Sequence, residues 1–124
     1  MPVPEGQIHP LRSTDLELPD QFDLVLLGVG PDGHTASLYP GRPELEATEP
    51  IVHVPEPGMP PRHPRLSFSL AYINAQRAAA LIVGGEGKRD ILARLLAGDE
   101  SLPAARVRAR QTTILADKAA ANSR

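Results

Sequence analysis

The feature that most constrains the fold is a repeated order of buried strand, glycine turn and helix. Residues 22–27 (FDLVLL) form an almost continuous apolar run that ends at Gly28, which is typical of a strand buried on both faces of a parallel sheet. Residues 78–83 (AAALIV) form a second such run, and apolar residues at helical spacing follow over 88–96. This alternation predicts an α/β fold with a mainly parallel sheet and flanking helices.

Weaker patterns predict the remaining elements. Residues 65–70 (RLSFSL) alternate apolar and polar side chains, so we expect a half-buried strand with Leu66, Phe68 and Leu70 on its inner face. Asp117 is placed to cap a terminal helix, and Gly98 to end the helix over 88–96. Further expected elements are a short strand over 7–9, a helical turn over 71–76 and a strand over 112–115.

Proline marks two irregular segments. Residues 1–20 are interrupted by four prolines and are expected to be a connecting segment. Residues 40–64, the Pro-rich segment, hold eight of the fourteen prolines and are expected to form a long extended loop with little regular structure. Loops of this length in compact domains are often functional. With 124 residues, the chain has the length of a single domain over 1–124.

Composition excludes several classes of function. The net charge is -2 and no basic block is present, which argues against a nucleic acid partner. Without cysteine there is no thiolate chemistry, and a zinc site would have only four histidines and the carboxylates to draw on. No apolar run approaches the roughly 20 residues of a membrane span, and the N-terminus lacks a signal pattern. We therefore expect no membrane contact and a cytoplasmic location.

The most informative segment for chemistry is 28–40 (GVGPDGHTASLYP), directly after the first buried strand. In α/β folds, ligands bind beyond the carboxyl ends of the strands. Gly28, Gly30 and Gly33 allow the backbone to turn tightly and to approach a ligand. We expect a short helix over 34–39, whose unpaired N–H groups would stabilise an anion or a developing oxyanion.

Asp32 and His34 lie two residues apart in this segment. Histidine can remove a proton from water, and a neighbouring carboxylate can fix its tautomer, so the pair predicts a general base. A capping or core histidine is an equally simple interpretation of the residues alone. The glycines also satisfy the G-x-G-x-x-G spacing of dinucleotide sites, but the acidic residue expected about 20 residues later would fall in the Pro-rich segment.

Residues 22–41, FDLVLLGVGPDGHTASLYPG, resemble the signature of the 6-phosphogluconolactonases, approximately LLGxGxDGHTASLFP. The resemblance continues through RLSFSLAYINAQRAAALIVGGEGKRDILARLLAG and LPAARVRAR to ILADKAAA, so it covers nearly the whole chain. Tyr39 stands where the family often has Phe. The resemblance implies a Rossmann-like sheet and hydrolysis of 6-phospho-D-glucono-1,5-lactone to 6-phosphogluconate in the pentose phosphate pathway.

The resemblance also implies roles for individual residues. His34 is the implied general base for water attack on the lactone, with Asp32 as its orienting partner. Backbone N–H groups near residues 30–34 are expected to stabilise the negative charge that develops. Lys88, in the sequence GGEGK, is expected to pair with the substrate phosphate, and Arg65 to reach the same site. No metal or organic cofactor is needed, because a lactone is already an activated ester.

Family members are longer, and their first half carries a glycine-rich phosphate loop and an S-D-E-R-like segment that this sequence lacks. A fragment, a miscalled start, a split gene or a true truncation would each explain the difference. We expect incomplete activity without an N-terminal half, and either self-association or a complementing partner, because a cut sheet exposes an edge. The alternatives are a phosphosugar isomerase or deaminase, and a phosphosugar-binding remnant without catalysis.

Overall fold

A computed structural model describes residues 2–121 of the chain. The strands are β1 (Val25–Gly28), β2 (Ile51–Val54), β3 (Arg65–Phe68), β4 (Ala78–Val83) and β5 (Gln111–Ala116). The α-helices are α1 (Leu70–Asn74), α2 (Arg89–Leu96) and α3 (Lys118–Ala121). The 3-10 helices are η1 (Glu5–Gln7), η2 (Pro43–Glu46), η3 (Glu86–Lys88) and η4 (Pro103–Arg106). No helix within residues 2–121 is both long enough and apolar enough to cross a membrane.

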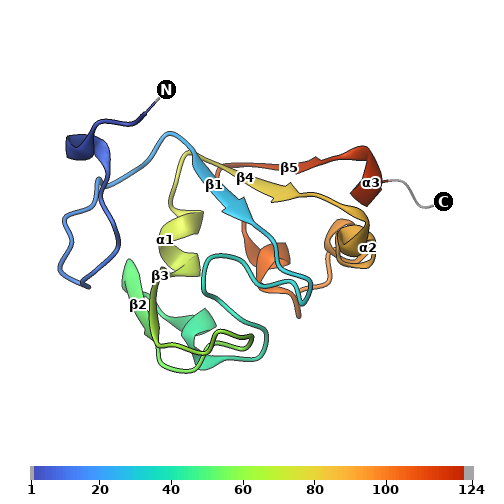
Figure 1. The fold of residues 1–124 in the computed structure, drawn as a ribbon, viewed down its shortest axis with the longest axis horizontal. Helices are drawn as coiled ribbons and strands as arrows, with labels where there is room; N and C mark the ends of the chain where they lie inside the picture. Colours follow the sequence, from blue (N-terminus) through green and yellow to red (C-terminus); the bar gives the residue numbers. More distant parts are fainter. Residues whose placement is uncertain (1, 122–124) are drawn as a thin grey trace.

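The expected parallel sheet is confirmed. Strands β1, β4 and β5 pair in parallel in the order β1-β4-β5, with Leu27 beside Leu81 and Leu81 beside Ile114. Figure 1 shows these strands side by side, with α1 and α2 below them in this view. Strands β2 and β3 form a separate antiparallel pair, so the fold is an α/β arrangement with a small β appendage.

The two faces of the parallel sheet differ in burial. One face packs on α2, η4 and neighbouring segments, and its Leu27, Leu81 and Val83 side chains are buried. The opposite face, called the open face here, exposes its large apolar side chains by 47–62%. These side chains are Leu24, Leu26, Ile82 and Leu115. The prediction that the first strand is buried on both faces is therefore wrong, because no element within residues 2–121 covers the open face.

Most of the predicted helices are confirmed, together with their end signals. The α1 helix covers most of the expected turn over 71–76, and the Ser69 side chain caps it by accepting a hydrogen bond from the Tyr72 N–H. The Asp117 carboxylate caps α3 by accepting from the Ala120 N–H at 2.8 Å. Gly98 follows α2 with φ +76°, as expected of a helix-ending glycine. The predicted strands over 78–83 and 112–115 correspond to β4 and β5.

Two local predictions are wrong. Residues 7–9 form no strand, because Gln7 is the last residue of η1 and residues 8 and 9 belong to no element. The Pro-rich segment is more regular than expected, since it contains η2 and β2, and β2 pairs with β3. The strand predicted over 65–70 is confirmed as β3, but its polar Ser67 is buried and its Leu66 and Phe68 are partly exposed. The Ser67 hydroxyl donates to the Phe68 carbonyl and accepts from the Ser37 N–H. These two hydrogen bonds offset the cost of removing the serine hydroxyl from water.

Candidate active site

The segment after β1 forms a tight hairpin over residues 35–38. Thr35 and Leu38 exchange two backbone hydrogen bonds of 3.3 and 2.9 Å, and Ala36 has φ +51°. The buried Thr35 hydroxyl donates to the Gly28 carbonyl at 2.8 Å, which ties the hairpin to the end of β1. The helix predicted over 34–39 is therefore wrong, because these local bonds replace the helical pattern.

The hairpin also changes which backbone N–H groups are free. The N–H groups of Gly30, Gly33 and His34 donate to the His34 carbonyl, the Gly30 carbonyl and the Asp32 carboxylate, respectively. These three N–H groups are engaged within the turn and are not available to an oxyanion. The N–H groups of Asp32 and Ala36, by contrast, make no hydrogen bond within residues 2–121.

His34 and Asp32 form the pair that the sequence predicted. The His34 Nδ1 and Asp32 Oδ1 atoms are 2.6 Å apart, and the two side chains are 22% and 31% exposed. Because an ionised carboxylate only accepts hydrogen bonds, the proton of a neutral imidazole belongs on Nδ1. The lone pair of Nε2 is then free to accept a proton.

Gly30 makes room for the imidazole. A Cβ atom at residue 30 would lie 2.1 Å from Cε1 and 2.2 Å from Nδ1 of His34, so the imidazole or the backbone would have to move. Gly28, Val29, Gly30, His34 and Ala36 line a shallow groove of about 350 Å³. The imidazole thus lies against the glycine backbone at the wall of an open groove.

Gly33 has a different function from the other two glycines. Its φ is +88°, and an added Cβ would lie 2.6 Å from Leu102 Cδ2. Its carbonyl accepts a hydrogen bond from the Ala104 N–H at 3.0 Å. The structure therefore places Gly33 in the packing between the turn and η4, and not on the groove.

Lys88 contacts Val29, one of the residues that line the same groove, although it is distant in sequence. It is the last residue of η3 and precedes α2, in the turn that follows β4. Its ammonium group donates a hydrogen bond to the Val29 carbonyl. Because β1 and β4 are neighbours in the sheet, the two glycine turns meet at the carboxyl ends of their strands.

Arg65 reaches His34 only through Tyr39. The Arg65 guanidinium donates to the Tyr39 hydroxyl at 3.2 Å and to the Pro61 carbonyl at 2.6 Å. The Tyr39 ring in turn stacks on the His34 imidazole, with ring centroids 4.6 Å apart and an interplanar angle of 29°. Sequence reasoning missed this contact. An aromatic residue five positions after the histidine was the available signal.

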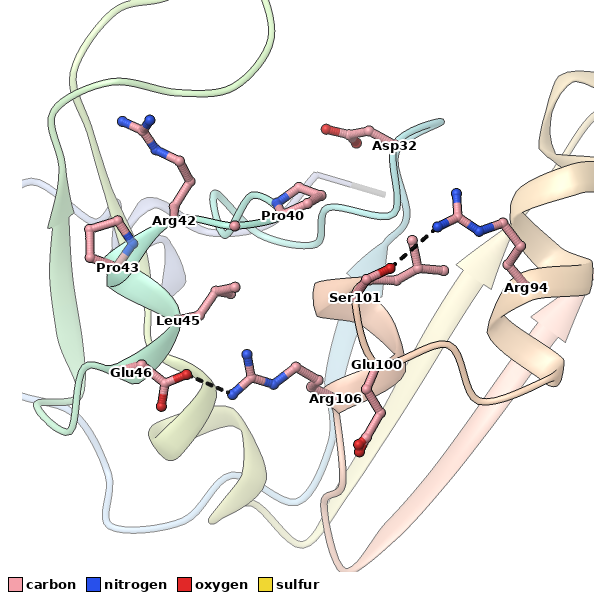
Figure 2. Close-up of a pocket in the computed structure, with 12 residues that line it drawn as sticks. Asp32, Pro40, Arg42, Pro43, Leu45, Glu46, Arg94, Glu100, Ser101 and Arg106 are labelled. Atoms are coloured by element: carbon pink, nitrogen blue, oxygen red, sulfur yellow. Dashed lines mark hydrogen bonds and ion pairs between the residues drawn. The ribbon is translucent and has the colours of Figure 1, made fainter.

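A larger cleft of about 880 Å³ opens on the other side of Asp32. Figure 2 shows Asp32 at its rim, with Arg94 and Ser101 on one wall and Arg42 on the other. Each arginine of this cleft is paired with a carboxylate, at distances of 2.7 to 3.2 Å. The pairs are Arg94–Asp99, Arg106–Glu46 and Arg42–Glu56. A ligand in this cleft would have to compete with these ion pairs.

The histidines outside the turn do not join the site's contacts. Within residues 2–121, no three His, Asp or Glu side chains lie close enough together to hold a metal ion. His53 lies in β2 and lines a separate surface groove beside Arg65. The side chains in contact with His34 are therefore those of Asp32 and Tyr39, and Lys88 joins them through Val29.

Comparisons with known proteins agree with this geometry. The 6-phosphogluconolactonase of Rattus norvegicus is 46% identical over 90 residues, which cover 72% of this chain and 35% of the rat protein. The crystal structure of 6-phosphogluconolactonase from Thermotoga maritima superposes with a TM-score of 0.70 at 30% identity, over 79% of this chain and 44% of that one. A monomeric glucosamine-6-phosphate deaminase superposes with a TM-score of 0.66 at 25% identity, over 82% of this chain and 48% of that one.

The chain spans about a third of the length of the mammalian lactonases that it matches, 34–35% in each case. Residues 2–116 match the family described as glucosamine-6-phosphate isomerases/6-phosphogluconolactonase. That range includes both glycine turns, the 35–38 hairpin and all three strands of the parallel sheet. The chain therefore belongs to the family of glucosamine-6-phosphate isomerases and 6-phosphogluconolactonases.

Proposed function

We propose that this chain supplies the general-base part of a 6-phosphogluconolactonase site, for hydrolysis of the lactone in the pentose phosphate pathway. The observation that carries the proposal is the His34–Asp32 pair at 2.6 Å, with the imidazole at the wall of an open groove. The sequence similarity to curated 6-phosphogluconolactonases supports the choice of substrate. The Nδ1–H tautomer leaves Nε2 as the atom that takes the proton.

The proposed reaction needs two proton transfers and no cofactor. His34 Nε2 takes a proton from water as the water oxygen bonds to the lactone carbonyl carbon, which gives a tetrahedral oxyanion. The oxyanion then collapses, the bond to the ring oxygen breaks, and the imidazolium returns the proton to that leaving oxygen. Asp32 stabilises the imidazolium between the two steps. The unengaged Ala36 N–H in the groove is our candidate for an oxyanion donor.

Lys88 is proposed to bind the substrate phosphate. Its ammonium group has three N–H donors, and the bond to the Val29 carbonyl uses one of them. The carbonyl that it binds belongs to Val29, which lines the groove together with His34, and this supports a contact with an anionic substrate group there. For Arg65 we propose an indirect contribution, because its guanidinium is bound to Tyr39 and Pro61.

We further propose that a complementing polypeptide or a second copy completes the domain over the open face. Exposed leucine and isoleucine side chains on one sheet face support this, since such patches mark interaction surfaces. The edge of β1 away from β4 has no strand partner within residues 2–121, which supports it as well. In this proposal residues 1–124 act as one half of a larger domain in the cytoplasm.

The test is turnover of 6-phosphogluconolactone, corrected for spontaneous hydrolysis. The chain and its His34→Ala variant are assayed alone and with a polypeptide covering the part of a relative that the chain does not match. We expect turnover that falls by roughly 100-fold or more in the variant, the usual contribution of a general base. Equal rates for both proteins, even with the complementing polypeptide, would refute the proposal.

The similarity to a glucosamine-6-phosphate deaminase favours one alternative, a phosphosugar isomerase or deaminase. Such a reaction moves protons on the sugar carbons and needs further acid and base groups. Glu46 pairs with Arg106, and Glu44 is buried in η2, so neither lines the groove. Ammonia release from glucosamine 6-phosphate would support the deaminase over the lactonase. Phosphosugar binding without turnover of either substrate would indicate a remnant that has lost catalysis.

A further inference from the structure

Tyr39 is the most buried aromatic side chain near the groove, at 2% exposure, and it contacts three different segments. Its ring stacks on the His34 imidazole at 4.6 Å. Its hydroxyl accepts a hydrogen bond from Arg65 Nη1 at 3.2 Å. The ring also lies against Gly58 of the Pro-rich segment, where an added Cβ would come 3.0 Å from Tyr39 Cδ1. Burial in the core alone would not explain why Tyr39 contacts the His34 imidazole, Arg65 and Gly58 together.

The contacts of His34 explain why a stacked ring matters. Asp32 holds the imidazole at one atom, Nδ1, and a single hydrogen bond leaves the ring free to rotate about it. On one side, Cε1 and Nδ1 of His34 occupy the space that a side chain at residue 30 would fill, so the ring lies close to the Gly30 backbone. A stacked aromatic ring fixes the remaining freedom, the plane of the imidazole, and so fixes the direction in which Nε2 points.

The Tyr39 hydroxyl links this plane to the Pro-rich segment. Arg65 holds the hydroxyl with one nitrogen and the Pro61 carbonyl with another. A phenylalanine at residue 39 would keep the stacking but could not accept the bond from Arg65. The link between Arg65 and the imidazole therefore depends on the hydroxyl.

We propose that Tyr39 is a positioning residue for His34, and that its hydroxyl transmits the position of Arg65 and the Pro-rich segment to the imidazole. The catalytic meaning of this inference rests on the function proposed above, but the positioning itself does not. Arg65 acts here through Tyr39, and not by direct contact with the imidazole.

The test is the NMR signal of the His34 ring protons, assigned by their loss in His34→Ala. A ring proton above an aromatic face shifts upfield, so we expect an upfield His34 signal in the unmodified chain. Tyr39→Phe should keep most of this shift, and Tyr39→Leu should abolish it. An unchanged His34 signal in a folded Tyr39→Leu chain would overturn the proposal.

Arg65→Gln tests the link through the hydroxyl and does not depend on folding of the leucine variant. It should move the His34 signal in the unmodified chain and have no effect in the Tyr39→Phe background. Arg62→Gln, in the Pro-rich segment three residues before Arg65, is the matched control and should leave the His34 signal unchanged. Equal effects of Arg65→Gln in both backgrounds, or no effect in either, would overturn the link. Because no readout needs turnover, these shifts in a chain that stays inactive even with the complementing polypeptide would refute only the proposed function.

Discussion

The turn after β1 and the turn after β4 both leave the carboxyl end of a parallel strand, and an aspartate contacts each of them. In the first turn, residues 28–34, Asp32 holds the His34 ring and the His34 N–H, and a hairpin follows. In the second turn, residues 84–88, Asp117 accepts hydrogen bonds from the Gly85 N–H, and η3 and α2 follow. Added Cβ atoms at Gly30 and Gly33 of the first turn would clash at 2.1 and 2.6 Å, whereas those at Gly85 and Gly87 of the second would meet nothing within 4 Å.

This difference separates a turn that positions a side chain from a turn that starts a helix. In the first turn, backbone and side chain are packed so closely that the conformation of one residue determines that of the next. In the second, the glycines only redirect the chain so that Lys88 reaches the Val29 carbonyl across the strands. Substitutions of Gly30 and Gly33 should therefore affect chemistry and packing, and the same substitutions in the second turn should cause no steric clash.

Gly30→Ala should have the largest effect on activity. The added Cβ would overlap the His34 ring at 2.1 Å, so the imidazole must leave its place beside Asp32. We expect lactone turnover to fall by roughly 100-fold or more, close to the His34→Ala level. Gly87→Ala, in the second turn, is the control and should retain turnover. If both variants hydrolyse the lactone equally well, the crowding of the first turn has no role in catalysis.

Gly33→Ala and Gly85→Ala form a matched pair for stability. Both glycines have positive φ, +88° and +93°, so each substitution adds about 1–3 kcal/mol of backbone strain. Only residue 33 adds a clash, 2.6 Å from the buried Leu102, which costs about 1–3 kcal/mol more. Urea unfolding should show a larger loss of unfolding free energy for Gly33→Ala. Equal losses would mean that Leu102 moves aside without cost.

Lys88→Met should affect substrate binding more than the chemical step. The variant loses the bond to the Val29 carbonyl and the charge proposed to pair with phosphate. A hydrogen bond to a charged group contributes about 1.5–3 kcal/mol, so KM should rise by about tenfold or more while kcat changes less. Lys118→Met removes the only other lysine and serves as control. A fall in kcat with KM unchanged would place Lys88 in the transition state and not in phosphate binding.

The sequence predicted those parts of the fold that depend on apolar periodicity. The runs at 22–27 and 78–83 became β1 and β4, and the apolar spacing over 88–96 became α2. It also predicted the pairing of Asp32 with His34, which the structure confirms. Lys88, expected from the resemblance to bind phosphate, contacts the carbonyl of Val29 in the same turn. Their catalytic roles stay predictions, which the substitutions above test.

The remaining features depend on contacts that no local pattern records. The 35–38 hairpin needs a positive φ at Ala36, and alanine gives no signal for that conformation. The stacking of Tyr39 on His34 depends on Gly58 and Arg65, which follow 19 or more residues later. The burial of β1 on one face only depends on what packs against the sheet, which the strand's own composition does not determine.

The smallest expected effect concerns the aspartate of the second turn. Hydrogen bonds from the Ala120 and Gly85 N–H groups lower the pKa of the Asp117 carboxyl below its ordinary value. A lowered folded-state pKa stabilises the fold above the unfolded pKa, about 3.9, and this stabilisation is lost as the pH falls through the folded-state value. Asp117→Asn should therefore lower the thermal midpoint slightly at pH 7, and the difference from the unmodified chain should shrink below about pH 4. Asp15→Asn, in the N-terminal segment, is the control. A difference that stays constant down to pH 2 would show that the second turn depends on the shape of this side chain and not on its charge.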